Sequence, residues 1–274
     1  MYKRVLFSLD LEGVNNVVGV PYEGLVKGCD QWKIAVEQAT LEINTAADAL
    51  FEAGVEEVGL WDGHGGSQNL DESKIDPRVT FLHPEAGLPR LYFAKDYDCI
   101  CFFGYHAMEG TLGGVLAHTM SSKCLQFYKI NGKYVGEVDM DAYIAASHGV
   151  PSVFFAAGNI ACAQALRAVP EMVTVHTKYE LERNKAEFRN NDDLLADIRK
   201  CIVTAVNREV PLKQLTYPVI FEKSFKRMED AAHELKKRKQ AGITAEHPLD
   251  DLLGRDAHTV ASTVHNISEF IASI

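Results

Sequence analysis

The stretch Val5-Leu6-Phe7-Ser8-Leu9-Asp10-Leu11-Glu12-Gly13 begins as an apolar run and ends in two carboxylates. Two later segments repeat this pattern: one leads through Trp61 to Asp62-Gly63-His64, and the other through Phe103 to Gly104-Tyr105-His106. Apolar runs of this length are typical of buried strands. In open α/β sheets, ligands bind beyond the carboxyl ends of the strands. The sequence therefore predicts one crevice that collects Asp10, Glu12, His64 and His106.

The spacing of the elements around this stretch indicates a parallel sheet. Strands are predicted over 4–10 and 55–62, and a helix over 30–53 separates them. Ile43, Ala46 and Leu50 lie on one face of that helix, as its buried stripe requires. A strand, a long helix and a second strand form a unit in which the strands run parallel.

The same alternation continues through the middle of the chain. Further strands are predicted over 98–104 and 152–156, and helices over 137–148, 159–168 and 192–207. The dipeptide Asn131-Gly132 after an apolar run is typical of a hairpin turn. We therefore expect an α/β fold, a three-layer and mainly parallel sheet with helices on both faces.

The sequence changes character after residue 210. Pro211 and Pro218 mark a linker, a strand begins at 219, and helices are predicted over 225–240 and 257–272. We expect an α/β metal-binding catalytic domain over 1–210 and a smaller C-terminal α+β portion over 211–274.

Composition narrows the class of protein. The 274 residues carry a formal net charge of -10, and no basic patch is dense enough to predict nucleic-acid binding. No apolar stretch is long enough to cross a membrane, and the N-terminus has no signal-peptide pattern. The six cysteines form no Cys-x-x-Cys pair or disulfide framework, which favours the cytoplasm.

The polar ends of the strands have the chemistry of a metal site. Asp10 and Glu12 would share one face of a strand, where two carboxylates repel unless a proton or a metal neutralises them. A helix-capping pair is the alternative for them, and a purely structural role is the alternative for His64.

Glu137, at a predicted helix start, is a fifth candidate ligand, or it only complements the helix dipole. Five ligands are more than one tetrahedral zinc ion can bind, and they suit two ions about 3.5–4 Å apart. His118, beyond a glycine-rich loop, is either a ligand or an acid/base.

Five motifs resemble, in order and nearly in spacing, those of the dinuclear-zinc D-aminopeptidases of the dipeptide-transport-operon type. They are Ser8-Leu9-Asp10-Leu11-Glu12-Gly13, Asp62-Gly63-His64, Gly104-Tyr105-His106-Ala107, His118-Thr119-Met120 and Val135-Gly136-Glu137. The resemblance covers about residues 1–160, whereas the chain from about Tyr217 matches only loosely. It implies two zinc ions held by five ligands, Asp10, Glu12, His64, His106 and Glu137, with His118 as the catalytic histidine.

The resemblance also implies a cytoplasmic homodecameric ring that removes an N-terminal D-amino acid, typically D-alanine, from short peptides. The loop 108–114 and the helix after Glu137 are expected to wall the pocket and to favour a small side chain. Two alternatives stay open: a dinuclear-metal hydrolase acting on a non-peptide amide or a phosphoester, and a non-catalytic metal-binding scaffold.

Overall fold

Six parallel strands form the central sheet in the computed structural model, which describes residues 1–274. Their spatial order is β3-β2-β1-β4-β7-β8, and every neighbouring pair is parallel. The strands are β1 (Arg4–Leu9), β2 (Glu57–Asp62), β3 (Val79–Leu82), β4 (Cys99–Phe103), β7 (Ser152–Ala157) and β8 (Val173–His176). The predicted mainly parallel sheet is confirmed.

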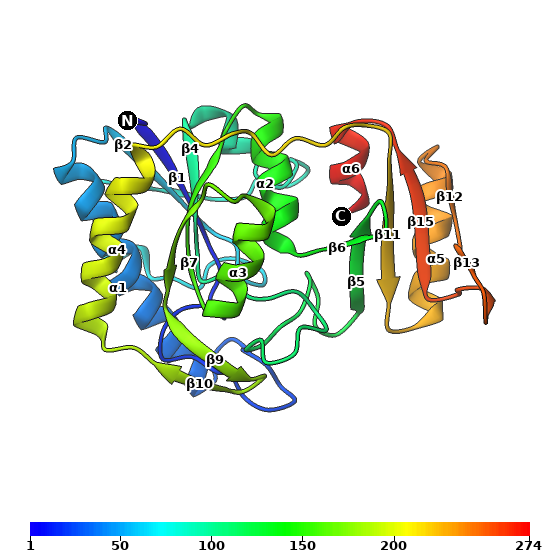
Figure 1. Cartoon of the computed structure of the whole chain (residues 1–274), viewed down its shortest axis with the longest axis horizontal. Coiled ribbons are helices and arrows are strands. Elements are labelled where there is room, and N and C mark those ends of the chain that lie inside the picture. The colour runs from blue at the N-terminus through cyan, green and yellow to red at the C-terminus, as the bar shows by residue number, and fades with distance from the viewer.

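Helices cover both faces of this sheet, which confirms the three layers (Figure 1). On one face lie α1 (Asp30–Glu52) and α4 (Asn191–Val206), which pack against each other. On the other lie α2 (Glu137–Ser147) and α3 (Asn159–Ala168). Because β4 is covered on both sides, all five of its residues are buried. No helix is both long and apolar enough to cross a membrane.

A second, antiparallel sheet lies beside the α2 and α3 layer (Figure 1). Its order is β12-β15-β11-β5-β6. The strands are β5 (Leu125–Ile130), β6 (Lys133–Val135), β11 (Val219–Phe225), β12 (Ala245–Glu246) and β15 (Thr259–Val264). The predicted hairpin turn is confirmed, because Asn131 and Gly132 have φ of 49° and 76° between the paired β5 and β6. Since this sheet takes strands from 125–135 as well, the boundary at 210 stays a prediction.

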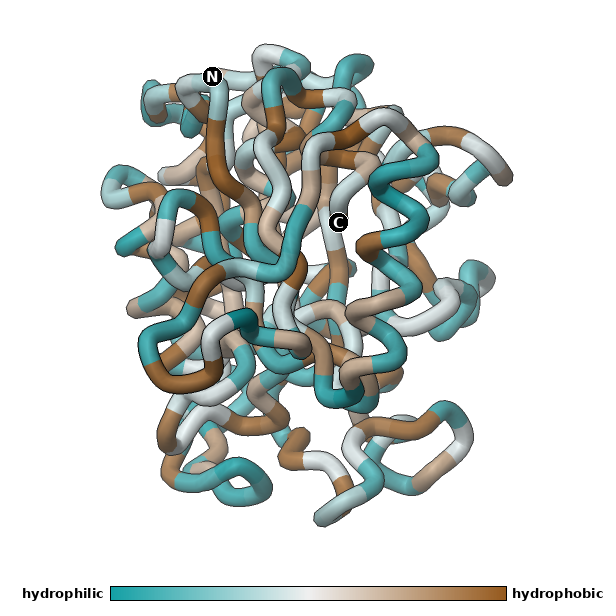
Figure 2. The backbone as a smooth tube through the Cα atoms, turned by 90° about the vertical axis from the view of Figure 1, so that its right-hand side faces the viewer, coloured by the Kyte–Doolittle hydropathy of each residue, from teal (hydrophilic) through white to brown (hydrophobic).

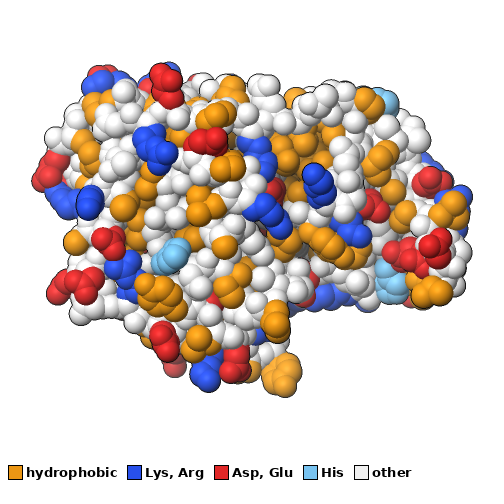
Figure 3. All heavy atoms as spheres, viewed as in Figure 1, with side chains coloured by type: hydrophobic (Ala, Val, Ile, Leu, Met, Phe, Trp, Pro, Cys, Tyr) orange, Lys and Arg blue, Asp and Glu red, His pale blue; other side chains and the backbone are white.

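Of the two helices of this second part, the first lies toward the far end of the molecule, whereas the second lies close to α2 (Figure 1). They are α5 (Met228–Gln240) and α6 (Ile267–Ser273). Figure 2, in which this end faces the viewer, shows the mostly hydrophilic course of α5. The linker residue Lys213 donates to the carboxylate of Asp139 and to the carbonyl of Ala168, which ties the linker to α2 and α3. Basic side chains gather near the middle of the face shown in Figure 3.

The helix predicted over 257–272 is wrong in its first half. Residues 259–264 form β15, which pairs with β11 along six residues, and α6 begins only at Ile267. The segment Thr-Val-Ala-Ser-Thr-Val is rich in β-branched residues, and it fits a pleated, largely buried surface better than a helix.

Two short hairpins and two 3₁₀ turns complete the chain. The hairpins are β9 (Lys178–Glu182) with β10 (Lys185–Phe188), and β13 (Leu249–Asp250) with β14 (Gly254–Arg255). The turns are η1 (Glu72–Lys74) and η2 (Tyr92–Asp96). None of these elements has a strong sequence pattern, and the β9–β10 hairpin proves to border the functional site.

Two glycines let the ends of β1 and β4 touch. A Cβ at Gly13 would lie 1.9 Å from the carbonyl oxygen of Tyr105. Gly104 has φ of +67°, and a Cβ there would lie 2.0 Å from the carbonyl oxygen of Asp10. Only glycine fits at either position. The segment that carries Asp10 and Glu12 therefore lies directly against the segment that carries His106.

Candidate metal centre

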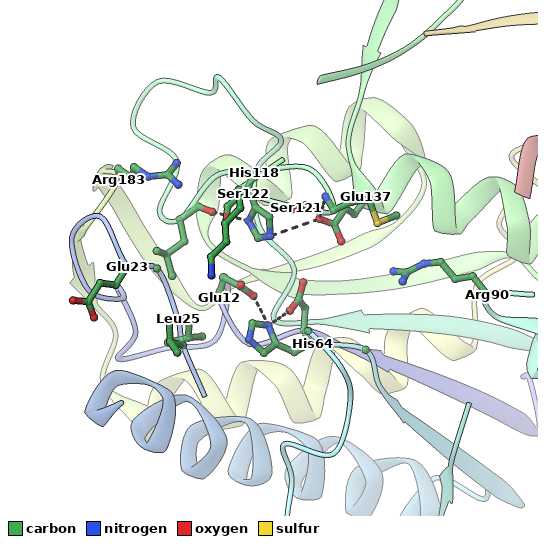
Figure 4. A pocket seen from close by; sticks show the side chains of 18 residues that line it. Glu12, Glu23, Leu25, His64, Arg90, His118, Ser121, Ser122, Glu137 and Arg183 are labelled. Carbon is green, nitrogen blue, oxygen red and sulfur yellow. Dashed lines mark hydrogen bonds and ion pairs between the residues drawn. The ribbon is translucent and has the colours of Figure 1, made fainter. Parts of the chain in front are cut away.

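The register of the parallel sheet places three of the predicted ligand segments at one edge. Leu9 pairs with Asp62 of β2 and with Phe103 of β4, so the three strands end level with one another. The fourth segment comes from α2, whose first residue is Glu137. Asp10, Glu12, His64, His106 and Glu137 all meet at this edge, as the sequence predicted. Figure 4 shows Glu12, His64 and Glu137 of this group.

Asp10 stands between two clusters of ligand atoms. Its Oδ1 lies 2.7 Å from Nδ1 of His64, and Glu12 Oε2 lies 3.1 Å from the same nitrogen. Its Oδ2 lies 3.5 Å from Nε2 of His106, which is 3.3 Å from Glu137 Oε1. Within each cluster the candidate ligand atoms all lie within 4.8 Å of one another. One carboxylate that serves both clusters is the arrangement expected of a bridging ligand.

His106 has the hydrogen bonding of a metal ligand. Its Nδ1 lies 3.0 Å from the carbonyl oxygen of Ala107, which assigns the proton to Nδ1. Its Nε2 is then an acceptor; it is buried, has no hydrogen-bond partner, and faces the carboxylates of Asp10 and Glu137. A buried lone pair that faces carboxylate oxygens requires a cation or a proton between them. The residues present therefore fit a divalent metal.

The electrostatics of the pocket also favour a bound cation. Burial lowers the pKa of His64, but the charge of Glu12 and the contact with Asp10 outweigh it and raise this pKa to about 11. Burial raises the pKa of Glu137, but the neighbouring His106 outweighs it and lowers this pKa to about 2. The low pKa keeps the Glu137 carboxylate ionised, and the high pKa of His64 shows that its carboxylate neighbours favour positive charge. Carboxylate oxygens and imidazole nitrogens suit zinc among the divalent metals.

His118 lies beside the clusters on an irregular loop. Its ring stacks on that of His106 with centroids 3.8 Å apart and planes 12° apart. Its Nδ1 lies 2.9 Å from the carbonyl oxygen of Leu116, so Nε2 faces the pocket, 4.0 Å from Glu137 Oε1. The residues two before and two after it, Leu116 and Met120, have φ of 51° and 59°. Non-glycine residues in this conformation are strained, and such strain clusters at functional sites.

A pocket of about 410 Å³ opens over these residues (Figure 4). Of the candidate ligands, Asp10, Glu12, His64 and Glu137 line it together with His118. The rest of the lining includes residues 23–26, Leu116, residues 120–123, Arg90 and Arg183. The predicted wall is wrong in both parts, because neither loop 108–114 nor the helix after Glu137 lines this pocket, and residues 108–111 line a separate one. The loop after β1 and the residues that follow His118 take that place.

Three residues of the β9–β10 hairpin support the site, and the sequence analysis missed them. Lys178 donates to carbonyls of the segment that carries Glu12. Glu180 accepts from the amide of Val115, and Arg183 donates to the carbonyl of Ala117, both in the His118 loop. A Lys-x-Glu pair in a short polar strand gives no sequence signal, because its partners lie more than 60 residues away.

The family model described as D-aminopeptidase matches residues 3–242. This chain belongs to the D-aminopeptidase family. A curated D-aminopeptidase of Bacillus subtilis (strain 168) is 28% identical over 187 residues, a segment that covers 66% of this chain and 65% of that relative's own length.

A solved structure supports the fold of this D-aminopeptidase family member. It is the Zn-dependent D-aminopeptidase DppA from Bacillus subtilis, described as a self-compartmentalizing protease. The two structures superpose with a TM-score of 0.83 over 98% of this chain and 94% of that one, at 20% sequence identity. At this identity the likeness shows the fold, and the β15 and α6 region that follows the matched residues 3–242 is part of it.

Proposed function

We propose that this chain is a zinc-dependent aminopeptidase that removes an N-terminal D-residue, such as D-alanine, from short peptides. The observation that carries the proposal is the position of Asp10 between two clusters of ligand atoms. In this assignment Asp10, Glu12 and His64 hold one ion, and Asp10, His106 and Glu137 hold the other. Family membership supplies the reaction class.

Two ions in these positions would supply an activated water and polarise the scissile carbonyl. The chain's own residues then set the geometry of the reaction. Asp10 would contribute to both metal positions, because its Oδ1 faces His64 and its Oδ2 faces His106. His118 holds its Nδ1 proton on the carbonyl oxygen of Leu116, so the lone pair of Nε2 faces the pocket. Nε2 would first accept the proton that the attacking water loses and then donate it to the leaving amine.

His118 also belongs to a third group of close donors, with Glu12 and His106. We assign it as the acid/base because its Nε2 approaches only one carboxylate oxygen, at 4.0 Å, whereas the assigned ligand histidines each approach two at 3.5 Å or less. A purely scaffolding metal protein would need the five ligands but no free imidazole beside them.

The proposed preference for a D-residue follows if the site fixes the substrate at two groups. When the site holds both the α-amino group and the scissile carbonyl of the substrate, inverting the configuration of the α-carbon exchanges the positions of its side chain and its hydrogen. A pocket that is open on one side only then rejects one hand by steric clash. The apolar residues that line the pocket are Leu25, Val26, Leu116 and Met120, and in this proposal they form its closed side.

The test is hydrolysis of matched D and L substrates by purified, zinc-loaded protein. We expect D-alanyl-D-alanine and D-alanyl amide to be cleaved faster than their L-counterparts. Faster cleavage of the L-substrates would leave a general dinuclear aminopeptidase. Cleavage of only blocked amides would indicate a non-peptide amidohydrolase, and no cleavage with two metals bound would indicate a scaffold.

We further propose that the chain assembles into a homo-oligomer, a decameric ring, in the cytoplasm. The description of DppA as self-compartmentalizing supports assembly, and the six cysteines, all free, suit a reducing compartment. Sedimentation at micromolar concentration tests the assembly, and a stable monomer would remove it without changing the active-site assignment.

A further inference from the structure

The segment that carries Glu12 is buried but has no regular structure. Residues 11–15 and 17 are buried, yet the segment forms neither helix nor strand. Buried backbone groups must find hydrogen-bond partners, and a loop cannot supply them from a ladder of its own. The carbonyl oxygens of this loop therefore depend on side chains from elsewhere.

Lys178 and its neighbour Thr177 are those side chains. The Nζ of Lys178 donates to the carbonyl oxygens of Glu12 at 2.5 Å, Val14 at 3.0 Å and Val17 at 2.6 Å. The hydroxyl of Thr177 donates to the carbonyl oxygen of Gly13 at 2.5 Å. Lys178 is fully buried, and its three N–H groups are all committed to this one loop.

Other ligands of the centre do not rely on Lys178. The amide of Asp10 donates to the carbonyl oxygen of Phe103, so Asp10 is fixed by the parallel sheet. Glu137 is held as the first residue of α2, and His106 by its own bond to Ala107. Glu12 differs, because its peptide group is held on one side by Lys178 and on the other by the bond from the amide of Gly13 to Gly104.

We infer that Lys178 is a positioning residue that fixes Glu12 and thereby sets the affinity of one metal position, that of Asp10, Glu12 and His64. The inference rests on the proposed role of Glu12 as a metal ligand. It makes a selective claim: removing the ammonium weakens one zinc and leaves the zinc of Asp10, His106 and Glu137 in place. Residues that orient a metal ligand contribute about 10–100-fold to metal affinity.

Zinc titration of Lys178→Met against a chromophoric chelator tests the claim. Methionine keeps most of the side chain's length and removes all three donors. We expect the wild type to bind two zinc ions tightly, and the variant to keep one and bind the second about 10–100-fold more weakly. Wild-type affinity at both positions, or an equal loss at both, would overturn the inference.

Two further variants separate this inference from the function on which it rests. Glu12→Ala should weaken the same single zinc. If it leaves zinc binding unchanged, the ligand assignment fails; if only Lys178→Met leaves it unchanged, the positioning role fails. Lys223→Met is the matched control, because Lys223 is a largely buried lysine of β11 that donates to the carbonyl of Ile274, far from the centre. It should keep both zinc ions.

Lys178→Gln covers the case in which the methionine variant does not fold. Glutamine retains two N–H donors on a shorter side chain, so part of the loop's bonding persists. A loss of affinity at one zinc position alone supports the inference, whereas an equal loss at both positions, or wild-type affinity at both, overturns it.

Discussion

The two halves of the site are built in different ways. The proposed metal ligands Asp10, His64 and His106 follow strands of the sheet, and the proposed ligand Glu137 starts a helix. His118 instead stands on a loop without regular structure, between two residues in the left-handed conformation. Bonds from Glu180 and Arg183 of the β9–β10 hairpin hold that loop in place. Most of the metal half is thus positioned by the core, with only the loop of Glu12 held by Lys178 of that hairpin, whereas the His118 half depends on the hairpin.

This difference has a functional consequence. A substitution that disrupts the metal half should remove the cations on which the proposed reaction depends. A substitution that disrupts the His118 half should leave the cations bound and slow proton transfer. Damage to the first half should therefore act on metal content and activity together. Damage to the second should act on turnover alone.

Asp10→Asn is expected to have the largest effect. The variant keeps the size of the side chain but removes the charge that serves both clusters, so zinc content should fall from about two per chain to fewer than about one. Hydrolysis should fall to background. Elemental analysis after gel filtration checks the metal content, and retention of both ions would contradict the bridging assignment.

Asp62→Asn is the matched control for this variant. Asp62 ends β2 at the position level with Leu9, but its carboxylate accepts from the amides of Asn69 and Leu70 and takes no part in the clusters. The variant should keep both zinc ions and lose about 1–3 kcal/mol of unfolding free energy, as expected for weakened bonds to a charged group.

His118→Ala is expected to have the next largest effect and to separate the two halves. If His118 transfers a proton, kcat should fall by about 10²–10⁴-fold while zinc content stays the same. His148→Ala, at the exposed C-terminal end of α2, should change neither quantity. Loss of zinc together with activity would make His118 a ligand and remove the distinction between the halves.

The same difference explains what the sequence could predict. The ends of parallel strands share one edge of a sheet, so recognising the strands before Asp10, His64 and His106 was enough to bring these residues together. The Gly-Glu pair at a helix start added Glu137. These inferences needed only local patterns and one rule of topology.

The supports of the site could not be predicted in this way. Lys178 and Glu180 lie in a short polar strand, and their partners are the loop after β1 and the loop before His118. Neither contact has a periodic pattern. The strand β15 was missed although its β-branched residues favour a strand, since the partner strand β11 that defines it lies about 40 residues earlier in the chain.

A third prediction concerns pH and the loop of the metal half. Glu42 of α1 is fully buried and accepts from the amide of Asn15 in that loop. Burial raises its pKa from 4.5 to about 7. Between these values the native state keeps the proton that the unfolded state releases, so this group's contribution to stability falls as pH rises through that range.

Glu42→Gln removes this dependence. The difference in unfolding free energy between variant and wild type should shift in favour of the variant by about 2–3 kcal/mol from pH 5 to pH 8. Urea unfolding at several pH values, with zinc in excess, measures it. Glu37→Gln, on the exposed side of α1, should show no such slope. A shift that favours the wild type at high pH would contradict the buried acid.

Arg183→Ala is expected to have the smallest effect, and it probes the hairpin's hold on the His118 half. Arg183 donates through Nη1 to the carbonyl oxygen of Ala117 at 2.6 Å, while its own carbonyl accepts from Leu116 through the backbone and survives substitution. The loop should loosen without detaching, so kcat should fall by about 3–10-fold with zinc content unchanged. Arg183→Lys should recover part of the loss because it keeps one donor. Lys185→Ala on the same hairpin, where the lysine contacts only Glu182, should have no effect.

Steady-state kinetics decide between two roles of Arg183, because this residue also lines the pocket. A fall in kcat at constant KM assigns Arg183 to the positioning of His118. A rise in KM alone would make it a substrate contact, and the His118 loop would then be supported by Glu180 and the backbone.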